Sequence, residues 1–311
     1  MPSLGDHLHI VSCGACHTLV HWIAYGILSC LYLYMALIQE LPIVDSELRE
    51  ITVLFEDLDA TKAPYRSDII HPDDIAATYF LDAHDVRPVH VTARNASRMG
   101  PAWRQTGYQD SILGGGTTFY FGGVEAEECR IWLDRDIAAT IIAKVTERSL
   151  ARFIGYNGQP MMPAHEGLLK EQPAKTMPVV CFTFETCTHS EEDIRQALAE
   201  LGLAHLFLET APYHGSEELR YAQIARADKG VGIQTYQELT GLQISESASV
   251  GDSGPDRRMH PYTALRFVMG NSTPELLASP YPYQRVKPVN EQGYSEVAKL
   301  IVRHNLDYAG V

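Results

Sequence analysis

The chain has 311 residues, of which 45% are hydrophobic and 21% are charged, and its formal net charge is −14. This length and apolar content are typical of one large globular domain or two modest ones, and they exclude a disordered or fibrous chain. Without a basic excess to displace counterions, nucleic acid and anionic membrane surfaces are poor candidates for the main partner. A small anionic substrate remains compatible, because one bound cation can outweigh the global field.

The six cysteines are sparse and unevenly spread along the chain. They do not form the dense, regular pattern of a disulfide framework, so we expect a reducing, cytoplasmic location.

The first 48 residues form an unusual hydrophobic extension. Residues 18–38 contain no Asp, Glu, Lys or Arg, and this length would span a bilayer. No Lys or Arg precedes Arg49, so neither a signal-peptide n-region nor a positively charged membrane flank is present. Three interpretations stay open: a membrane helix that tethers the protein, a buried or interfacial helix, and a natural start at Met35.

After residue 48 the pattern alternates between strands and helices. Residues 51–55 form a continuous apolar, β-branched run, which predicts a strand buried on both faces of a parallel sheet. Residues 72–85 have helical spacing, and residues 88–91 predict a second strand. This β-α-β order indicates an α/β fold with a doubly wound parallel sheet, whose ligands lie beyond the carboxyl ends of the strands.

The middle of the chain predicts a different unit. A helix at residues 136–148 and a Gly/Pro-rich loop at 155–163 precede a strand at 179–184, a helix capped by Ser190 and a strand near 205–209. From residue 229 the β-α order resumes, with a helix at 231–242, a strand at 248–250 and a terminal helix at 294–304. We therefore expect a core made of residues 49–123 and 225–311, interrupted by an inserted α+β cap at 124–224.

Polar clusters follow the predicted core strands. Asp57, Asp59 and Thr61 come directly after the first strand, and two carboxylates one residue apart at a sheet edge are costly unless a cation or a proton compensates them. Each of these clusters has an ordinary structural explanation by itself, as a turn, a helix cap or a flexible loop. Their order and context make the set informative; its other members are Thr92, Arg94, Lys229, Asp252 and Asp256.

These residues resemble the motifs of the haloacid dehalogenase superfamily of phosphatases. Asp57-Leu58-Asp59-Ala60-Thr61 is similar to the first motif, Thr92 to the second, Lys229 to the third, and Gly251-Asp252-Ser253-Gly254-Pro255-Asp256 to the fourth. The insertion between the second and third motifs matches the position of a type C2 cap. The segments 116–120 and 269–276 resemble the sucrose-phosphate phosphatase-like branch, and Cof-like sugar-phosphate phosphatases share part of this pattern.

The resemblance implies a magnesium-dependent phosphatase with an aspartyl-phosphate intermediate. Asp57 would be the nucleophile, Asp59 the general acid and base, and Lys229 the cation that offsets charge on Asp57 and on the phosphoryl group. Mg²⁺ would bind at Asp57, Asp59, Asp252 and Asp256, with Asp59 contributing its backbone carbonyl and Asp256 orienting Lys229 or a metal-bound water. The residues expected to contact a phosphorylated sugar are Thr61, Thr92, Arg94, Lys229 and Asn271.

Two departures from the family pattern keep an alternative open. Ala93 stands where Gly is usual, and Pro255 replaces a common Asn beside Asp256, which removes a backbone donor. The expected substrate is sucrose 6-phosphate or a hexose phosphate, with a mannosyl-3-phosphoglycerate phosphatase-like or broad-specificity Cof-type enzyme as the alternative. A module that binds a phosphorylated ligand and hydrolyses it weakly is the alternative from another class.

Overall fold

The computed structural model describes residues 48–65, 67–107, 110–156, 162–163, 179–212 and 218–310. The hydrophobic segment 18–38 and its possible membrane role lie outside these residues. Within the part of the chain that is described, no helix has both the length and the apolarity needed to cross a bilayer.

The larger sheet has eight strands in the order β13-β12-β11-β1-β2-β3-β4-β5. Strands β13 to β3 run parallel, while β4 and β5 are antiparallel additions at one edge. The central position of β1 places its carboxyl end between those of β2 and β11. The strands are β1 (Val53–Glu56), β2 (Arg87–Val91), β3 (Asp110–Leu113), β4 (Thr118–Phe121), β5 (Val124–Glu125), β11 (Ser247–Gly251), β12 (Leu265–Val268) and β13 (Gln284–Arg285).

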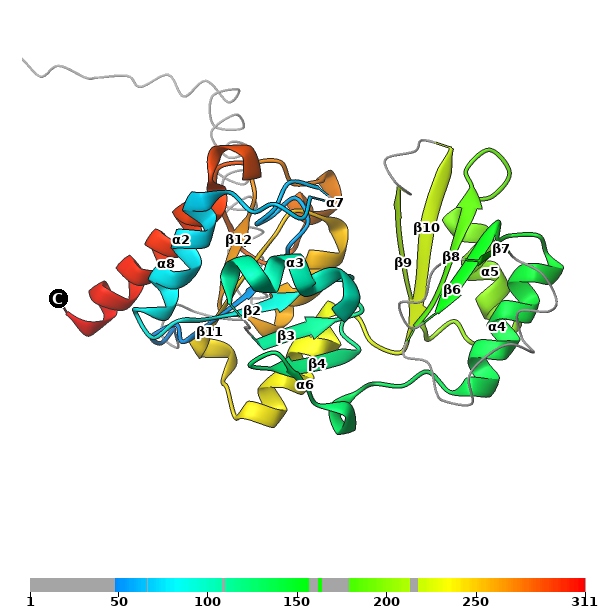
Figure 1. The fold of residues 1–311 in the computed structure, drawn as a ribbon, viewed down its shortest axis with the longest axis horizontal. Helices are drawn as coiled ribbons and strands as arrows, with labels where there is room; N and C mark the ends of the chain where they lie inside the picture. Colours follow the sequence, from blue (N-terminus) through cyan, green and yellow to red (C-terminus); the bar gives the residue numbers. More distant parts are fainter. Residues whose placement is uncertain are drawn as a thin grey trace, which may run out of the picture. The chain divides into compact units, whose positions relative to one another are not determined.

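Helices cover both faces of this sheet (Figure 1). The helices α2 (Pro72–Asp82), α3 (Ala96–Thr106) and α8 (Gly293–Ala309) lie on one face. The helix α6 (Lys229–Thr240) and the 3₁₀ segment η5 (Gly254–Tyr262) pack on the other. The pleat of β1 divides its side chains accordingly: Leu54 packs with α2 and α8, and Phe55 packs against Tyr236 of α6. Shorter elements are α7 (Pro274–Leu277), η2 (Glu127–Cys129), η4 (Ile244–Glu246) and η6 (Val289–Glu291).

A second, antiparallel sheet has the order β7-β6-β8-β10-β9. Its apolar face, which includes Phe182, Phe184 and Ile224, forms a separate hydrophobic core with the helices α4 (Arg135–Glu147) and α5 (Glu191–Glu200). Ser190 caps α5 in a capping box with Asp193, as its sequence position predicts. The strands are β6 (Phe153–Tyr156), β7 (Met162–Pro163), β8 (Val179–Glu185), β9 (Phe207–Pro212) and β10 (Leu219–Ala225).

The expected fold class is confirmed: an α/β sheet with helices on both faces and a second α+β unit between its two parts. The division into domains stays a proposal, and one boundary differs in detail. Val124–Glu125 pairs with β4 and so belongs to the larger sheet, because the chain turns back at Gly122 before it leaves. The elements that pack on the second sheet begin with α4.

Candidate active site

The parallel register of β1 and β11 brings two acidic residues together. Glu56 is aligned with Val250, so Asp57 and Asp252 each follow immediately after adjacent strands. Thr61 Oγ1 lies 3.4 Å from Asp57 Oδ2 and 3.1 Å from Asp252 Oδ1. The two residues are separated by 195 positions in the chain, yet one hydroxyl contacts both carboxylates.

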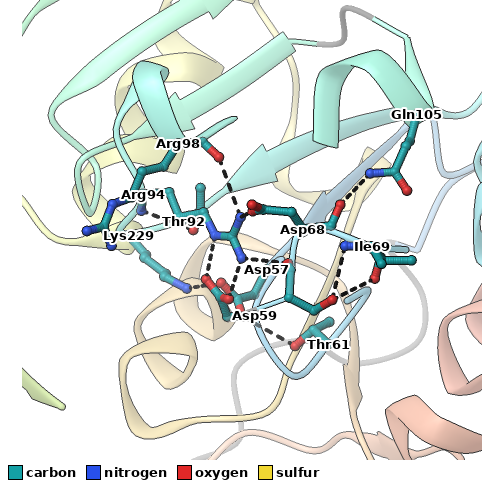
Figure 2. Close-up of polar contacts among 11 residues, drawn as sticks. Asp57, Asp59, Thr61, Asp68, Ile69, Thr92, Arg94, Arg98, Gln105 and Lys229 are labelled. Carbon is teal, nitrogen blue, oxygen red and sulfur yellow. Dashed lines mark hydrogen bonds and ion pairs between the residues drawn. The ribbon is translucent and has the colours of Figure 1, made fainter. Parts of the chain in front are cut away.

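Lys229 completes the centre of the site (Figure 2). It is the first residue of α6, and its Nζ donates to Asp57 Oδ1 at 2.7 Å and to Asp256 Oδ1 at 2.6 Å. Asp228 caps this helix by accepting from the Val231 amide, which fixes the backbone beside the lysine. Lys229 and Asp57 have only 4% and 6% of their side-chain surface exposed, so solvent screens this ion pair weakly.

Asp256 is held by the turn that starts η5. Its Oδ2 accepts from the Asp252 amide, and from both the amide and the hydroxyl of Ser253, at 2.9–3.0 Å. Its Oδ1 is occupied by Lys229. Pro255 sits at the first turn of η5, where its missing N–H would have no intrahelical acceptor, so it leaves this arrangement intact. Both oxygens of Asp256 therefore orient other groups of the site.

Asp59 and Arg94 form a bidentate pair beside the centre (Figure 2). Arg94 Nε donates to Asp59 Oδ2 at 2.9 Å and Arg94 Nη2 donates to Asp59 Oδ1 at 2.7 Å. Arg94 also donates to Asp68 Oδ1 and to the Ser67 carbonyl. The guanidinium was expected to face a substrate anion; in this structure it is engaged by carboxylates, because an unpaired cation that is 9% exposed would be costly.

The remaining predicted residues support the loops of the site. The Thr92 hydroxyl accepts from the Arg94 amide at 3.2 Å, immediately after β2. The Asn271 side chain donates to the Ala60 carbonyl and accepts from the Val289 amide, so it ties the loop after β1 to the chain after β13. Ala60 has a positive φ of 61°, and the bond from Asn271 helps to hold this conformation.

The pKa values of the acidic residues and of Lys229 are shifted by burial and by the close approach of several carboxylates. Burial raises the pKa of Asp57 well above its ordinary value, with Asp256 and Asp252 adding to the shift and Lys229 opposing it. Burial and then Asp256 raise the pKa of Asp252 to about 7. Burial would lower the pKa of Lys229, but the carboxylates of Asp256 and Asp57 raise it above that of a free lysine.

The donor set fits a hard divalent cation. Oxygens of Asp57, Asp252 and Asp256 lie within 4.8 Å of one another, and the single ammonium of Lys229 pairs with two of these residues, Asp57 and Asp256. When all three carboxylates are ionised, two negative charges are left over, which one Mg²⁺ would balance with the oxygen ligands that it prefers. Because Asp256 is already saturated with donors, Asp57 and Asp252 are the side chains best placed to hold the ion.

A buried ion pair beneath the site was missed from sequence. Glu56 and Lys62 are both 0% exposed, and Lys62 Nζ donates to Glu56 Oε1 at 2.6 Å. His90 Nδ1 lies 2.8 Å from the same oxygen, and Lys62 also faces the Tyr294 ring. Burial opposes ionisation, but these two neighbours lower the pKa of Glu56 to about 2. Strand alternation after Phe55 was the only signal, since it pointed Glu56 to the face opposite Asp57.

Solved structures with a similar fold include haloacid dehalogenase superfamily proteins, which confirms the resemblance at the level of fold. One is a phosphatase of this superfamily from Bacteroides thetaiotaomicron, with a TM-score of 0.66, 17% identity, and coverage of 84% of this chain and 98% of its own. A subclass IIB sugar phosphatase matches with a TM-score of 0.60 and 17% identity, over 80% of this chain and 98% of its own. A haloacid dehalogenase-like hydrolase from B. subtilis has a TM-score of 0.63 and 14% identity, over 80% and 99%.

No family model and no curated protein matches the sequence. Identities of this size establish the shared fold alone, so the activity has to be argued from the site itself.

Proposed function

We propose that this protein is a magnesium-dependent phosphomonoesterase that hydrolyses a sugar phosphate through an aspartyl-phosphate on Asp57. The observation that carries the proposal is the buried cluster in which Lys229 bridges Asp57 and Asp256, while Asp252 lies beside Asp57 at the next strand end. A carboxylate nucleophile needs its own charge and that of the phosphoryl group offset, and this cluster offers an ammonium together with a cation-binding oxygen set. The subclass IIB sugar phosphatase with the same fold supports the substrate class.

The steps can be assigned to residues of this chain. Asp57 would attack phosphorus while Lys229 orients the carboxylate, and Mg²⁺ bound at Asp57 and Asp252 would offset the charge of the phosphoryl oxygens. Asp59 would protonate the leaving oxygen and later accept a proton from the attacking water. Because Arg94 occupies both oxygens of Asp59 in this structure, proton donation requires Asp59 to leave that pair. Thr92 would bind a phosphoryl oxygen from the loop after β2.

The test is hydrolysis of p-nitrophenyl phosphate by the purified full chain, with Mg²⁺ and after its removal by EDTA, followed by a panel of sugar phosphates. We expect turnover that is restored by Mg²⁺ and abolished in Asp57→Asn, which keeps nearly the same side-chain shape. Substantial activity of Asp57→Asn in a folded protein would contradict the mechanism.

A second function is favoured by one observation, the Arg94–Asp59 pair, in which Arg94 occupies both oxygens of the proposed acid and base. In that case the chain would bind a phosphorylated ligand and hydrolyse it weakly. Binding of a sugar phosphate without Mg²⁺-dependent release of phosphate would favour this alternative.

A further inference from the structure

A glycine turn connects the candidate active site with the second sheet. Gly114, Gly115 and Gly116 all have positive φ values, of 60°, 68° and 113°. The amides of Gly114 and Gly115 donate to the carbonyls of Arg94 and Thr92, so this turn lies on the loop after β2. A Cβ on Gly116 would lie only 2.0 Å from the Asp228 carbonyl oxygen, which shows how closely the turn approaches the start of α6.

The second sheet meets this turn with side chains of its polar face. Gln223 pairs with Cys181 on one side and with Glu209 on the other, so these three side chains project to the same face. This face is opposite to the one that packs on α4 and α5. Tyr221 lies two residues before Gln223 and shares its direction. We call Cys181, Glu209, Tyr221 and Gln223 the polar face.

Hydrogen bonds orient the glutamine of this face. The Cys181 Sγ and Tyr221 hydroxyl are 2.9 Å apart, the Tyr221 hydroxyl donates to Gln223 Oε1 at 3.1 Å, and Gln223 Nε2 donates to the Gly114 carbonyl at 3.0 Å. The amide is used at both ends, so Gln223 serves to join the polar face to the glycine turn.

Glu209 differs from its neighbours because it is charged and its carboxylate makes no hydrogen bond or ion pair with the described residues. A Cβ on Gly115 would lie 3.8 Å from Glu209 Oε2, which places this oxygen at the glycine turn. Burial raises the pKa of Glu209 above its ordinary value, and Lys229 lowers it while Asp256 and Asp228 raise it. Glu209 therefore lies within electrostatic reach of the residues that would handle the phosphate, although it belongs to the other sheet.

We infer that the polar face receives the leaving group of the substrate, and that Glu209 selects a leaving group rich in hydroxyls over one that carries a carboxylate. This inference rests on the proposed function, because it assumes a phosphoryl group at Asp57. A sugar hydroxyl can donate to the carboxylate of Glu209, whereas a second carboxylate would meet a like charge. The cations whose charge acts on this face belong to the larger sheet's helices: Arg98 of α3 acts on Cys181 and Tyr221, and Lys229 is already paired with Asp57 and Asp256. The substrate class is accordingly a neutral sugar or polyol phosphate, which disfavours a phosphoglycerate.

The test compares two ligands that differ at one end. Glucitol 6-phosphate and 6-phosphogluconate have the same phosphate and open polyol chain, but the second carries a carboxylate at C1 in place of a hydroxymethyl group. We expect the full-length protein with Mg²⁺ to prefer glucitol 6-phosphate in kcat/KM by about tenfold or more, the factor that corresponds to one modest like-charge contact. Glu209→Gln should reduce this preference to about twofold or less, mainly by improving the use of 6-phosphogluconate.

A matched control is Glu192→Gln, an exposed glutamate in the first turn of α5, which changes the net charge equally. It should leave the preference at its wild-type value. Equal use of the two compounds by the wild-type protein, or an unchanged preference in Glu209→Gln, would overturn the inference. If neither p-nitrophenyl phosphate nor a hexose phosphate is hydrolysed, the proposed function fails independently of this inference. The inference is then decided by calorimetry, which measures the affinity of the wild-type and Glu209→Gln proteins for the two compounds. The affinities should show the same preference, and the same loss of preference in Glu209→Gln, as expected for kcat/KM.

Discussion

The buried ion pair between Glu56 and Lys62 gives the sharpest prediction about stability. Replacing Lys62 with Met keeps the length of the side chain and removes its charge. Glu56 would then remain as a fully buried carboxylate, without the ammonium that donates to it at 2.6 Å. Removing one partner of a buried pair costs about 3–5 kcal/mol. His90 lies 2.8 Å from the same oxygen and can compensate in part, so we expect the lower end, about 3 kcal/mol.

The effects on the two partners differ for a physical reason. Glu56 has two close partners, Lys62 and His90, which lower its pKa, whereas Lys62 has one close carboxylate, and its own burial dominates and lowers its pKa. The charge of Glu56 is therefore stabilised more strongly by its surroundings than the charge of Lys62. A double variant, Glu56→Gln with Lys62→Met, removes both charges and should recover about 2 kcal/mol relative to the sum of the single losses.

Urea unfolding followed by circular dichroism measures these free energies. Lys144→Met is the matched control, because Lys144 is 21% exposed and its nearest carboxylates are 3.5–3.6 Å away at the surface. It should cost less than about 1 kcal/mol. If Lys62→Met costs no more than this control, or if the single losses add up in the double variant, the buried pair does not stabilise the folded protein.

Three further outcomes are expected. Asp256→Asn should destabilise the protein by about 2–4 kcal/mol and abolish turnover, because an amide has one acceptor oxygen whereas both oxygens of the carboxylate accept hydrogen bonds. An unfolding assay would measure the loss of stability, and a phosphate-release assay would measure the loss of turnover. Gly116→Ala should cost about 3 kcal/mol or more in urea unfolding, whereas Gly122→Ala, with φ +57° and no atom within 4 Å of the new Cβ, should cost only about 1 kcal/mol. Burial, and then Arg266, lower the pKa of His260 to about 4, so stability is lost as pH falls from about 6.5 to 4; His260→Gln should remove about 3 kcal/mol of that loss, measured by unfolding at each pH.

Strong local patterns accounted for much of the fold. The apolar run at residues 51–55 overlaps β1 at residues 53–55, and the predicted helices at 136–148 and 231–242 differ from α4 and α6 by one or two residues at their ends. The helix α3 was not predicted, since Gly100 and Pro101 interrupt its pattern and its stability comes from tertiary packing. Strands such as β12 and β13 are too short to carry a periodic signal of their own.

The composition of the site was more predictable than its contacts. The rule that ligands gather at the carboxyl ends of parallel strands brought Asp57 and Asp252 together from sequence alone. The same rule does not identify the partner of each side chain, so Arg94 was assigned to substrate although it binds Asp59. Such contacts depend on where loops of different origin meet, which no local pattern records.

Glu56 and Asp57 show why side-chain direction matters more than proximity in the chain. They are adjacent acids, yet the pleat of β1 sends Glu56 toward Lys62 and His90 on the α8 side and leaves Asp57 beside Lys229 at the sheet edge. Each carboxylate thus has its own cation, so the two charges need not share one environment. A shift of the strand by one residue would turn each side chain to the opposite face and separate Asp57 from the ammonium of Lys229. The register between β1 and β11 is therefore a condition of the proposed chemistry as much as of the fold.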